Sequence, residues 1–409
     1  MSATVPEPTV GVDLSTPDPI PEAAIERAVE LMRTGRLHRY GEESDGPSEA
    51  AALEAEFGEL VGRRYAVALS SGGSAIYVAL RCAGVEPGDA VLVNAFTLAP
   101  VPGAIAHAGA RAVLVEITED LVVDLDDLER QAARGDARVL LLSHMRGHMA
   151  DLHAVSEICA RHGLTLIEDC AHTLGATWNG RATGTWGAFG CFSTQTFKHL
   201  NSGEGGLLAC DDEEAAARAT LLSGSYALHA QHGRGPRSEV LERLRAHVPN
   251  LSLRMSALEA ALVRPQLATL AERIGRWNER HDAIVAGLRL LPELRLPRRP
   301  EAEGYVGSSL QFLVDRRPAG LAAFVAASRR RGLHLKWFGA AEPAGYTSTY
   351  RHWRYLSGLE PVPRSDAVLA RLCDMRIPSA LAPEEGEAIV RVIERALDET
   401  RGDGGADGG

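Results

Sequence analysis

The sequence predicts an α/β protein in which a large domain is followed by a smaller α+β domain. Apolar runs of three to five residues alternate with helical patterns from residue 66 onwards, which is typical of a mostly parallel sheet covered by helices. The 409 residues are 45% hydrophobic and 24% charged, which suits one large folded domain plus a smaller one. The pattern assigns residues 1–25 to an N-terminal arm, 26–290 to the large domain, 291–400 to the small domain and 401–409 to a disordered tail.

The first sixty residues predict an extended arm followed by two helices. Residues 1–20 are rich in Pro, Ser and Thr, which favour turns and extended backbone over helix. Apolar residues then recur at helical spacing over 21–32 and again over 48–60, so each of these segments is expected to bury one face. The loop between them, residues 35–41, contains a glycine at each end.

Buried strands are predicted where a short apolar run is bounded by glycine or polar residues. In the large domain these runs are 66–69, 91–93, 112–115, 139–143, 164–167 and 189–193, and another follows Gly206. Helices are predicted from Ser74 to Leu80, over 153–162 and 211–222, and from Arg254 onwards. Beyond Pro292 and the Pro/Arg cluster at 297–300, strands are predicted at 308–314 and 375–378 and helices at 321–331 and 384–398.

Three polar residues follow the predicted strands between residues 164 and 210. Asp169 ends one strand, Ser193 ends the next, and Lys198 lies five residues further along. In α/β folds, ligands bind at the carboxyl ends of the strands. Pyridoxal phosphate (PLP) requires such a set: a lysine forms a Schiff base with its aldehyde, an acid keeps its ring nitrogen protonated, and hydroxyl and N–H groups hold its phosphate. The spacing alone is only weakly specific, because isolated lysines are usually solvated.

A Ser/Gly turn is a second candidate for contact with a ligand. The run Ser70-Ser71-Gly72-Gly73-Ser74 opens a predicted helix, and the free N–H groups and positive dipole end of a helix attract an anion. Most turns of this kind only cap their helix. The turn by itself therefore does not establish a phosphate site.

Charge and cysteine content exclude several classes of function. The net charge is −11 and no basic block occurs, so nucleic acid is not an expected partner. The six cysteines form no C-x-x-C pair, which argues against a metal site or disulfide framework and for a reducing cytoplasm. His144 and His148 lack a third ligand at suitable spacing, so no metal is expected. The pattern contains neither a signal peptide nor a membrane-spanning run, and a cytoplasmic protein without membrane contact is expected.

The stretch from Leu164 to Cys210 resembles the DegT/StrS-type aminotransferases, a fold-type-I PLP family that acts on nucleotide sugars and aminocyclitols. Its acid pair, serine, lysine and glycine-rich turn stand at the spacing of that family. The matching residues are Glu168-Asp169, Ala171-His172, Gly175-Ala176, Phe192-Ser193, Lys198 and Gly203-Glu204-Gly205-Gly206. Further matches are His144, Gly147, Ala150, Asp151 and the segment from Arg254, so the resemblance covers roughly residues 20 to 400. It implies a large mixed-sheet α/β domain and a smaller C-terminal α+β domain.

The resemblance also implies a role for each candidate site residue. Lys198 would hold PLP and act as the general base, and Asp169 would keep the ring nitrogen protonated. His172 would lie against the cofactor, although a core histidine bonded to backbone is the alternative. Asn250 and Ser252 would reach the phosphate of a partner subunit, which implies at least a homodimer with shared active sites. The other positions that the family places around the cofactor are Gly72, Gly73, Ser74, Leu98 and Ser193.

Two positions depart from the pattern of the family. Gly73 stands where a threonine is usual, and Ser74 would supply the hydroxyl instead. Leu98 stands where an aromatic residue usually stacks on the pyridine ring, and leucine covers a ring without π-stacking. Phe96 would replace the aromatic residue only if the loop shifted.

The implied activity transfers an amino group from glutamate or glutamine to a keto group on a cyclic polyol, either a keto-cyclitol or a nucleotide keto-sugar, in secondary-metabolite or antibiotic biosynthesis. The segment from Asp169 to His172, Gln195 and Asn201-Ser202 favour the aminocyclitol and aminohydroxybenzoate branch. Alternatives are a PLP-dependent dehydratase or lyase, an aromatising enzyme on the same scaffold, or a non-catalytic homologue. Lys198 argues against the sugar dehydratases, which replace this lysine with histidine. The sequence does not name the acceptor or choose between the two donors.

Overall fold

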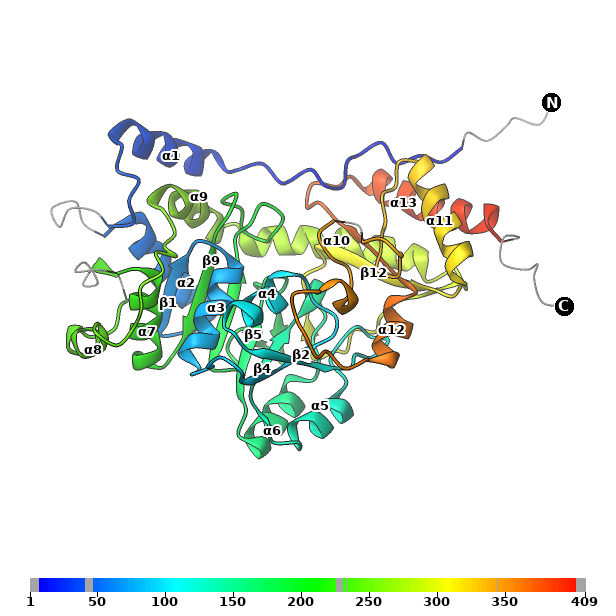
Figure 1. Cartoon of the computed structure of the whole chain (residues 1–409). Helices are drawn as coiled ribbons and strands as arrows, with labels where there is room; N and C mark the ends of the chain where they lie inside the picture. The colour runs from blue at the N-terminus through cyan, green and yellow to red at the C-terminus, as the bar shows by residue number, and fades with distance from the viewer. Residues whose placement is uncertain (1–6, 41–46, 226–230, 233, 344, 402–409) are drawn as a thin grey trace, which may run out of the picture.

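A computed structural model describes residues 7–40, 47–225, 231–232, 234–343 and 345–401. Its largest element is a seven-stranded sheet with the strand order β1-β9-β8-β5-β4-β2-β3 (Figure 1). Within this sheet β9 is antiparallel to both of its neighbours, and the other strands run in one direction. The strands are β1 (Tyr65–Leu69), β2 (Ala90–Asn94), β3 (Arg111–Val115), β4 (Ala137–Ser143), β5 (Thr165–Asp169), β8 (Phe189–Ser193) and β9 (Gly206–Cys210).

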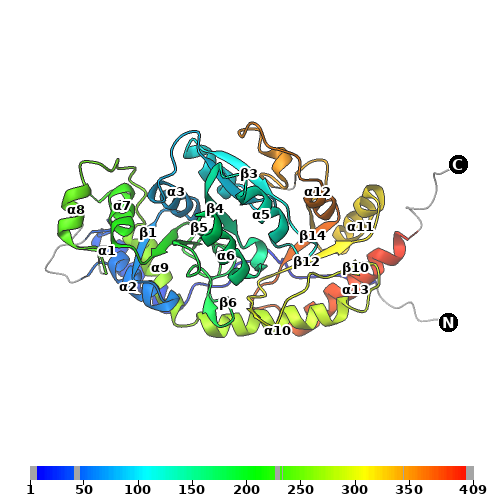
Figure 2. The same cartoon turned by 90° about the horizontal axis from the view of Figure 1, so that it is seen from below.

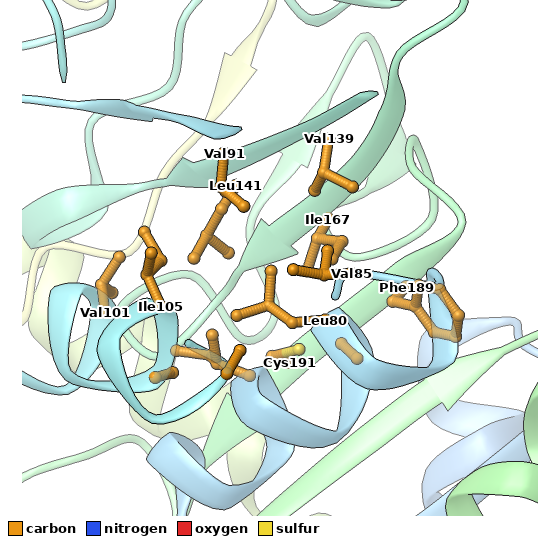
Figure 3. Packing of buried hydrophobic residues seen from close by; sticks show 14 of the residues in the cluster. Leu80, Val85, Val91, Val101, Ile105, Val139, Leu141, Ile167, Phe189 and Cys191 are labelled. Atoms are coloured by element: carbon orange, nitrogen blue, oxygen red, sulfur yellow. The ribbon is translucent and has the colours of Figure 1, made fainter. Parts of the chain in front are cut away.

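Helices cover both faces of the large sheet, which is why its strands are almost continuously apolar. Alternate strand residues such as Val91, Leu141 and Ile167 face one set of helices (Figure 3). The intervening residues, such as Leu92 and Leu140, face the other set. The first set is α3 (Gly72–Cys82), α4 (Pro100–His107) and α7 (Glu213–Ser223), and the second is α2 (Glu49–Val61), α5 (Leu125–Ala132), α6 (Leu152–His162) and α9 (Ala257–Leu267).

A second sheet, in the order β10-β12-β14-β13, belongs to the C-terminal part of the chain. It is antiparallel, and the apolar core beside it includes Phe312, Phe324 and Ile389. The long helix α10 (Leu270–Leu288) runs beside both parts of the molecule (Figure 2). The elements of this part are β10 (Leu294–Arg295), β12 (Ser309–Val314), α11 (Pro318–Arg330), β13 (Lys336–Trp337), α12 (Pro363–Leu369), β14 (Leu372–Arg376) and α13 (Pro383–Glu399).

The N-terminal segment crosses the molecule before its first helix. Residues 7–21 form no helix or strand, and Val10 N–H donates to the Arg331 carbonyl at 2.8 Å. The segment then runs past α10 to α1 (Glu22–Thr34), where Leu31 packs on α9 (Figure 1). The remaining elements of the described residues are α8 (Ser238–Leu244), two 3₁₀ helices (Met145–Gly147 and Tyr350–His352) and the small sheet of β6 (Thr177–Trp178), β7 (Arg181–Ala182) and β11 (Glu303–Gly304).

These elements confirm the predicted α/β fold class, with shifts in several element boundaries. The strand predicted at 375–378 overlaps only the end of β14, which begins at Leu372 and ends at Arg376. Pro378 cannot continue a ladder, and the buried Asp374 interrupts the apolar run. The helix expected to open at Arg254 begins at Ala257. There the Ser256 hydroxyl accepts the N–H of Glu259, whose carboxylate accepts the N–H of Ser256, which is a capping box.

The two sheets suggest where the chain divides. The strands of the seven-stranded sheet lie within residues 65–210, and those of the four-stranded sheet lie within 294–376. We therefore propose that the chain forms a large domain over 26–290 and a small domain over 291–400. Of the predicted terminal segments, residues 1–6 and 402–409 lie outside the described residues. Among the helices that the structure describes, none combines the length and the apolar character needed to cross a bilayer.

Replacing Gly206 by alanine tests the closest backbone packing at the site end of the sheet. A Cβ at Gly206 would lie 2.4 Å from the carbonyl of Ser71, so Gly206→Ala should lower the free energy of unfolding by about 1–3 kcal/mol. The matched control is Gly275→Ala, because Gly275 is exposed within α10 and a Cβ there meets nothing within 4 Å. This control should raise stability by about 0.5–1 kcal/mol. Urea unfolding measures both, and equal effects would contradict the packing argument.

Candidate active site

The carboxyl ends of four parallel strands meet at one edge of the large sheet. Leu69 at the end of β1 and Ser193 at the end of β8 both pair with Gly206 in β9. Asp169 at the end of β5 pairs with Ser143 at the end of β4. The register therefore brings the predicted acid, the predicted hydroxyl and the Ser/Gly turn after β1 to the same edge, which is where ligands bind in α/β folds.

The Asp169 carboxylate is buried and held by hydrogen bonds at both oxygens. Oδ2 accepts from Ser143 Oγ at 2.8 Å, and Oδ1 accepts from the Ala171 N–H at 3.1 Å. Thr97 Oγ1 in turn donates to Ser143 Oγ at 2.9 Å. Donors of this kind fix the direction in which a carboxylate points.

The neighbouring Glu168 points to the opposite face of β5 and has a structural role. Its oxygens accept backbone N–H groups of Gly184, Trp186 and Gly187 at 2.7–2.9 Å. Burial alone would raise its pKa, but the hydrogen bond with His144 and those with the backbone hold its pKa below the usual value. The two acids therefore have different roles. Glu168 holds the turn at residues 184–187, and Asp169 faces the site.

His144, Glu168 and Cys170 bring their potential ligand atoms within 4.8 Å of one another. All three side chains are buried. Both Glu168 oxygens already accept backbone hydrogen bonds, so the cluster is explained without a metal ion.

Lys198 lies beyond β8 with its amine against His172. The distance from Lys198 Nζ to His172 Nε2 is 3.0 Å. Burial, together with the positive charge of Arg146, lowers the pKa of Lys198 to about 7, although Asp169 opposes this shift. Burial and the charge of Lys198 lower the pKa of His172 well below its usual value. His172 is therefore neutral, and its ring nitrogen can accept a hydrogen bond from the Lys198 amine.

The Ser/Gly turn packs directly on the end of β8. The Ser71 hydroxyl caps α3 by accepting the Ser74 N–H at 2.9 Å. A Cβ at Gly72 would lie 2.8 Å from the Cβ of Ser193, so only glycine allows the turn to approach this serine. At Gly73 the nearest atom would be 3.5 Å away, which is ordinary contact. Packing therefore does not explain why a glycine replaces the usual threonine.

Two hollows near Lys198 share lining residues, and both involve residues that were not predicted. The inner hollow, about 60 Å³, is lined by Lys198, His172, Arg146, Arg273, Trp277 and Arg376. The outer hollow, about 790 Å³, is lined by Leu98, Arg146, His334, Lys336, Asp374 and Arg376. Arg146 and Arg376 line both hollows. Two sequence signals could have identified these residues. Arg146 is a polar residue in the turn after β4, and Arg376 is an arginine within a predicted strand.

Leu98 covers the outer hollow, and Phe96 does not replace it. Phe96 is buried against Phe338, with their ring centroids 5.2 Å apart. Leu98 is half-buried beside that cluster and lines the outer hollow together with Arg146. The side chain at this wall is therefore aliphatic.

Asn250 and Ser252 lie apart from the inner hollow of their own chain. Both are exposed, and the Ser252 N–H donates to Asn250 Oδ1 at 2.9 Å. Their neighbours Leu251 and Leu253 line a separate hollow of about 520 Å³ together with Ser74. The contact of Asn250 and Ser252 with the phosphate of a partner subunit stays a prediction.

A profile of the DegT/DnrJ/EryC1/StrS aminotransferase family matches residues 20–394. The chain belongs to this family. Membership in the DegT/DnrJ/EryC1/StrS family confirms the predicted family, the fold and the PLP-dependent aminotransferase class. The crystal structure of 3-amino-5-hydroxybenzoic acid (AHBA) synthase superimposes with a TM-score of 0.80 at 25% identity, covering 95% of this chain and 99% of that chain.

Two curated relatives match parts of the chain. A pleiotropic regulatory protein from Geobacillus stearothermophilus is 32% identical over 244 residues, which is 59% of this chain. A Micromonospora echinospora protein, provisionally named L-glutamine:3-amino-2,3-dideoxy-scyllo-inosose aminotransferase, is 37% identical over 177 residues, which is 43% of this chain. The matched part spans 61% of the first relative and 42% of the second.

The pKa of Lys198 predicts how stability depends on pH in the protein without cofactor. The folded-state pKa, about 7, lies below the ordinary 10.5, so the unfolded chain binds the extra proton between these values and stability rises with pH across this window. Lys198→Met removes this contribution. Its stability advantage over the wild type should therefore be largest below about pH 7 and should shrink towards about pH 10. Urea unfolding of both proteins across that range measures the difference, and a difference independent of pH would contradict the assignment.

Proposed function

We propose that the protein is a PLP-dependent aminotransferase that moves an amino group from L-glutamine or L-glutamate to a keto group on a cyclic polyol. The observation that carries this proposal is the Lys198 amine, half-buried with its pKa lowered to about 7, at the sheet edge that also holds the fixed carboxylate of Asp169. The neutral amine is the form that acts as a nucleophile and as a base, and a pKa of about 7 leaves a substantial share of it at neutral pH.

The residues at this edge fit PLP. Asp169 would hold the ring nitrogen, and its fixed negative charge would keep that nitrogen protonated. The first N–H groups of α3 at Gly72 and Gly73, together with the hydroxyls of Ser74 and Ser193, would hold the phosphate. Lys198 would bind the aldehyde carbon, with His172 beside the ring and Leu98 as an apolar cover. When bound, PLP supplies an electron sink for the electron pair at the carbon that bears the amine.

Lys198 and its neighbours would carry the proton transfers. Lys198 Nζ would take the proton from the carbon that bears the substrate amine, because its pKa lies near neutral pH. His172, held neutral by burial and by the charge of Lys198, would orient the amine through the 3.0 Å contact. Asp169 would hold the ring nitrogen and would not itself move a proton.

The names of the relatives support the choice of substrates. The Micromonospora echinospora relative is named for glutamine as the donor and an amino-dideoxy-inosose as the acceptor. An amino donor and a keto-cyclitol, or a related nucleotide keto-sugar, are therefore the proposed substrate pair. A role in antibiotic or other secondary-metabolite biosynthesis follows as part of the same proposal.

A second candidate is a regulatory homologue without turnover. It is favoured by one finding, the 32% identity to a pleiotropic regulatory protein. A third, an aromatising enzyme on the same scaffold, is favoured by the structural similarity to AHBA synthase. Transfer of an amino group from L-glutamine would argue against the regulatory candidate and would favour the aminotransferase.

The proposed enzyme is a cytoplasmic homodimer. In this proposal each active site takes residues from two subunits, and Asn250 and Ser252 of one subunit reach the phosphate of the other. The exposure of both side chains supports that arrangement, because they remain available to a partner. Neither nucleic acid nor a membrane is a proposed partner.

Replacing Lys198 by alanine should abolish turnover without unfolding the protein. The variant loses both the amine that binds PLP and the base, so the rate of amino transfer should fall by at least roughly 10³-fold. The measurement is the absorbance of the PLP-loaded protein before and after L-glutamine or L-glutamate is added. Circular dichroism checks the fold, and full activity in the Lys198→Ala variant would refute the assignment.

Replacing Asp169 by asparagine tests the fixed charge separately. The amide keeps the shape of the side chain but carries no negative charge to keep the ring nitrogen protonated. We expect turnover to fall by roughly 10²-fold or more while PLP stays bound. A steady-state assay combined with PLP fluorescence separates the two effects. An Asp169→Asn variant that turns over at the wild-type rate would show that the charge is not needed.

A further inference from the structure

A further hollow, the α10 hollow, borders the turn that carries Arg146. It has a volume of about 230 Å³ and is lined by residues of helix α10, of the segment 296–299 and of strand β12. It shares no lining residue with the two hollows near Lys198. The turn after β4 contributes Arg146 to those two hollows and His148 to the α10 hollow. One short turn thus borders the candidate active site and a separate hollow.

Part of the wall of the α10 hollow is apolar. Val285 comes from α10, Leu310 comes from β12, and Leu296 and Pro297 come from the segment between them. The ring of Tyr305 also lines the hollow. Apolar walls with a few polar groups are typical of sites for small organic ligands. The wall therefore suits a ligand with an apolar body.

The polar part of the wall carries two arginines. Arg289 is the C-cap residue of α10, is exposed, and pairs with no carboxylate of the described residues. Arg299 pairs with Glu303 at 2.7 Å, but its Nη2 is buried without a hydrogen-bond partner. Asp282 is the one carboxylate among the described residues that line the hollow, and it already accepts from the Tyr305 hydroxyl. The charge of Arg289 and one donor of Arg299 are therefore left without a partner.

The two histidines of the wall add no charge. Burial above all lowers the pKa of His148 and of His281, and the positive charge of Arg299 adds to both shifts. Both rings are therefore neutral near pH 7. The positive charge that a ligand meets in the α10 hollow thus comes from Arg289 and Arg299.

Arg299 also holds the backbone of the turn that carries Arg146. Its Nη1 donates to the Gly147 carbonyl at 3.0 Å. Arg146 has a left-handed backbone (φ 58°), which costs a non-glycine residue about 1 kcal/mol or more and requires support from the surrounding structure. A ligand that redirects the Arg299 guanidinium would therefore weaken the support of this turn.

A chain of hydrogen bonds leads from the same wall to the side chain of Arg146. His148 Nε2 lies 2.8 Å from Gln311 Oε1, and Gln311 Nε2 donates to Asp374 Oδ1 at 2.8 Å. Asp374 Oδ2 accepts from Arg146 Nη2 at 2.6 Å. Second to burial, the positive charge of Arg146 lowers the pKa of Lys198. The α10 hollow and the Lys198 amine are thus connected through the position of Arg146.

We propose that the α10 hollow is a regulatory site for a small organic carboxylate with an apolar body. The carboxylate would pair with Arg289 and Arg299, because a guanidinium edge binds both oxygens of a carboxylate, and the body would cover Val285 and Leu310. Since Nη2 of Arg299 is covered in the free protein, the guanidinium would turn towards the ligand and loosen its hold on Gly147. The binding is independent of the proposed function, and the regulation rests on it.

Benzoate is the probe, because it joins a carboxylate to an apolar ring. In calorimetric titrations of the PLP-loaded protein, Arg289→Gln should raise the dissociation constant of benzoate by roughly tenfold or more, and Arg289→Lys should lie between that variant and the wild type. The matched control is Arg329→Gln, because Arg329 is exposed on α11 and also pairs with no carboxylate of the described residues. This control should bind benzoate like the wild type.

Two further probes test the two parts of the ligand. Benzyl alcohol has the ring without the charge, and inorganic phosphate has charge without the ring. Each should bind the wild type at least roughly tenfold more weakly than benzoate. A probe that binds as tightly as benzoate, and whose binding Arg289→Gln weakens equally, would overturn the assignment of the ligand class.

The regulation is measured as the rate of amino transfer from saturating L-glutamine. Saturating benzoate should lower this rate in the wild type by roughly threefold or more, because a displaced Arg146 no longer helps to keep the pKa of Lys198 low. The same concentration of benzoate should have little effect on Arg289→Gln. Excess L-glutamine should not remove the effect, because the α10 hollow lies apart from the hollows near Lys198.

Equal dissociation constants of benzoate in the wild type and Arg289→Gln overturn the site. Inhibition that excess L-glutamine removes, or that persists in Arg289→Gln, places benzoate in the active site and overturns the regulation. Binding that Arg289→Gln weakens, without any effect of benzoate on the rate, supports the site and overturns its regulatory role. A wild-type protein that transfers no amino group refutes the aminotransferase proposal, and the titration still decides the site in that case.

Discussion

The pairing of β9 between β1 and β8 is the constraint on which the candidate active site depends. Gly206 pairs with Leu69 on one side and with Ser193 on the other, so the turn that opens α3 must fold over the first residue of β9. A Cβ at Gly206 would clash with Ser71, and one at Gly72 would clash with Ser193. The absence of side chains at two positions therefore places an anion-attracting helix start directly against a hydroxyl.

Uncompensated charge is the second feature of the site. Lys198, Arg146 and Arg376 gather at the inner hollow, and Asp374 is already engaged by Arg146 and Gln311. Burying several cations beside one another costs stability, and such an arrangement is expected at a functional site. The lowered pKa values of Lys198 and Arg376 are two results of the same arrangement. The lowered pKa of Lys198 makes its amine available for chemistry.

At the site, a polar contact also joins the two parts of the chain that carry the two sheets. Arg146 comes from the turn after β4, and its partner Asp374 comes from β14, 228 residues later. Helix α10 runs beside both sheets on the outside, as Figure 2 shows. A displacement of one sheet relative to the other would therefore disturb the Arg146–Asp374 pair, because a charge-assisted hydrogen bond of 2.6 Å tolerates little change in geometry.

The sequence by itself determined the residues whose position follows from their own strand. Asp169 and Ser193 could be placed at the sheet edge because short apolar runs end there, and the alternation of side chains explains why Glu168 faces away. The roles of these two residues and of Lys198 came from the resemblance to the family and stay predictions. The roles of Asn250 and Ser252 remain predictions, because they depend on a second subunit. Only the tertiary structure decided the places of Arg146 and Arg376, and local patterns also missed the start of β14, where Asp374 is buried within the strand. The physical reason is that local periodicity encodes which face of an element is buried, whereas a meeting of charges from two sheets depends on the packing of elements far apart in the chain.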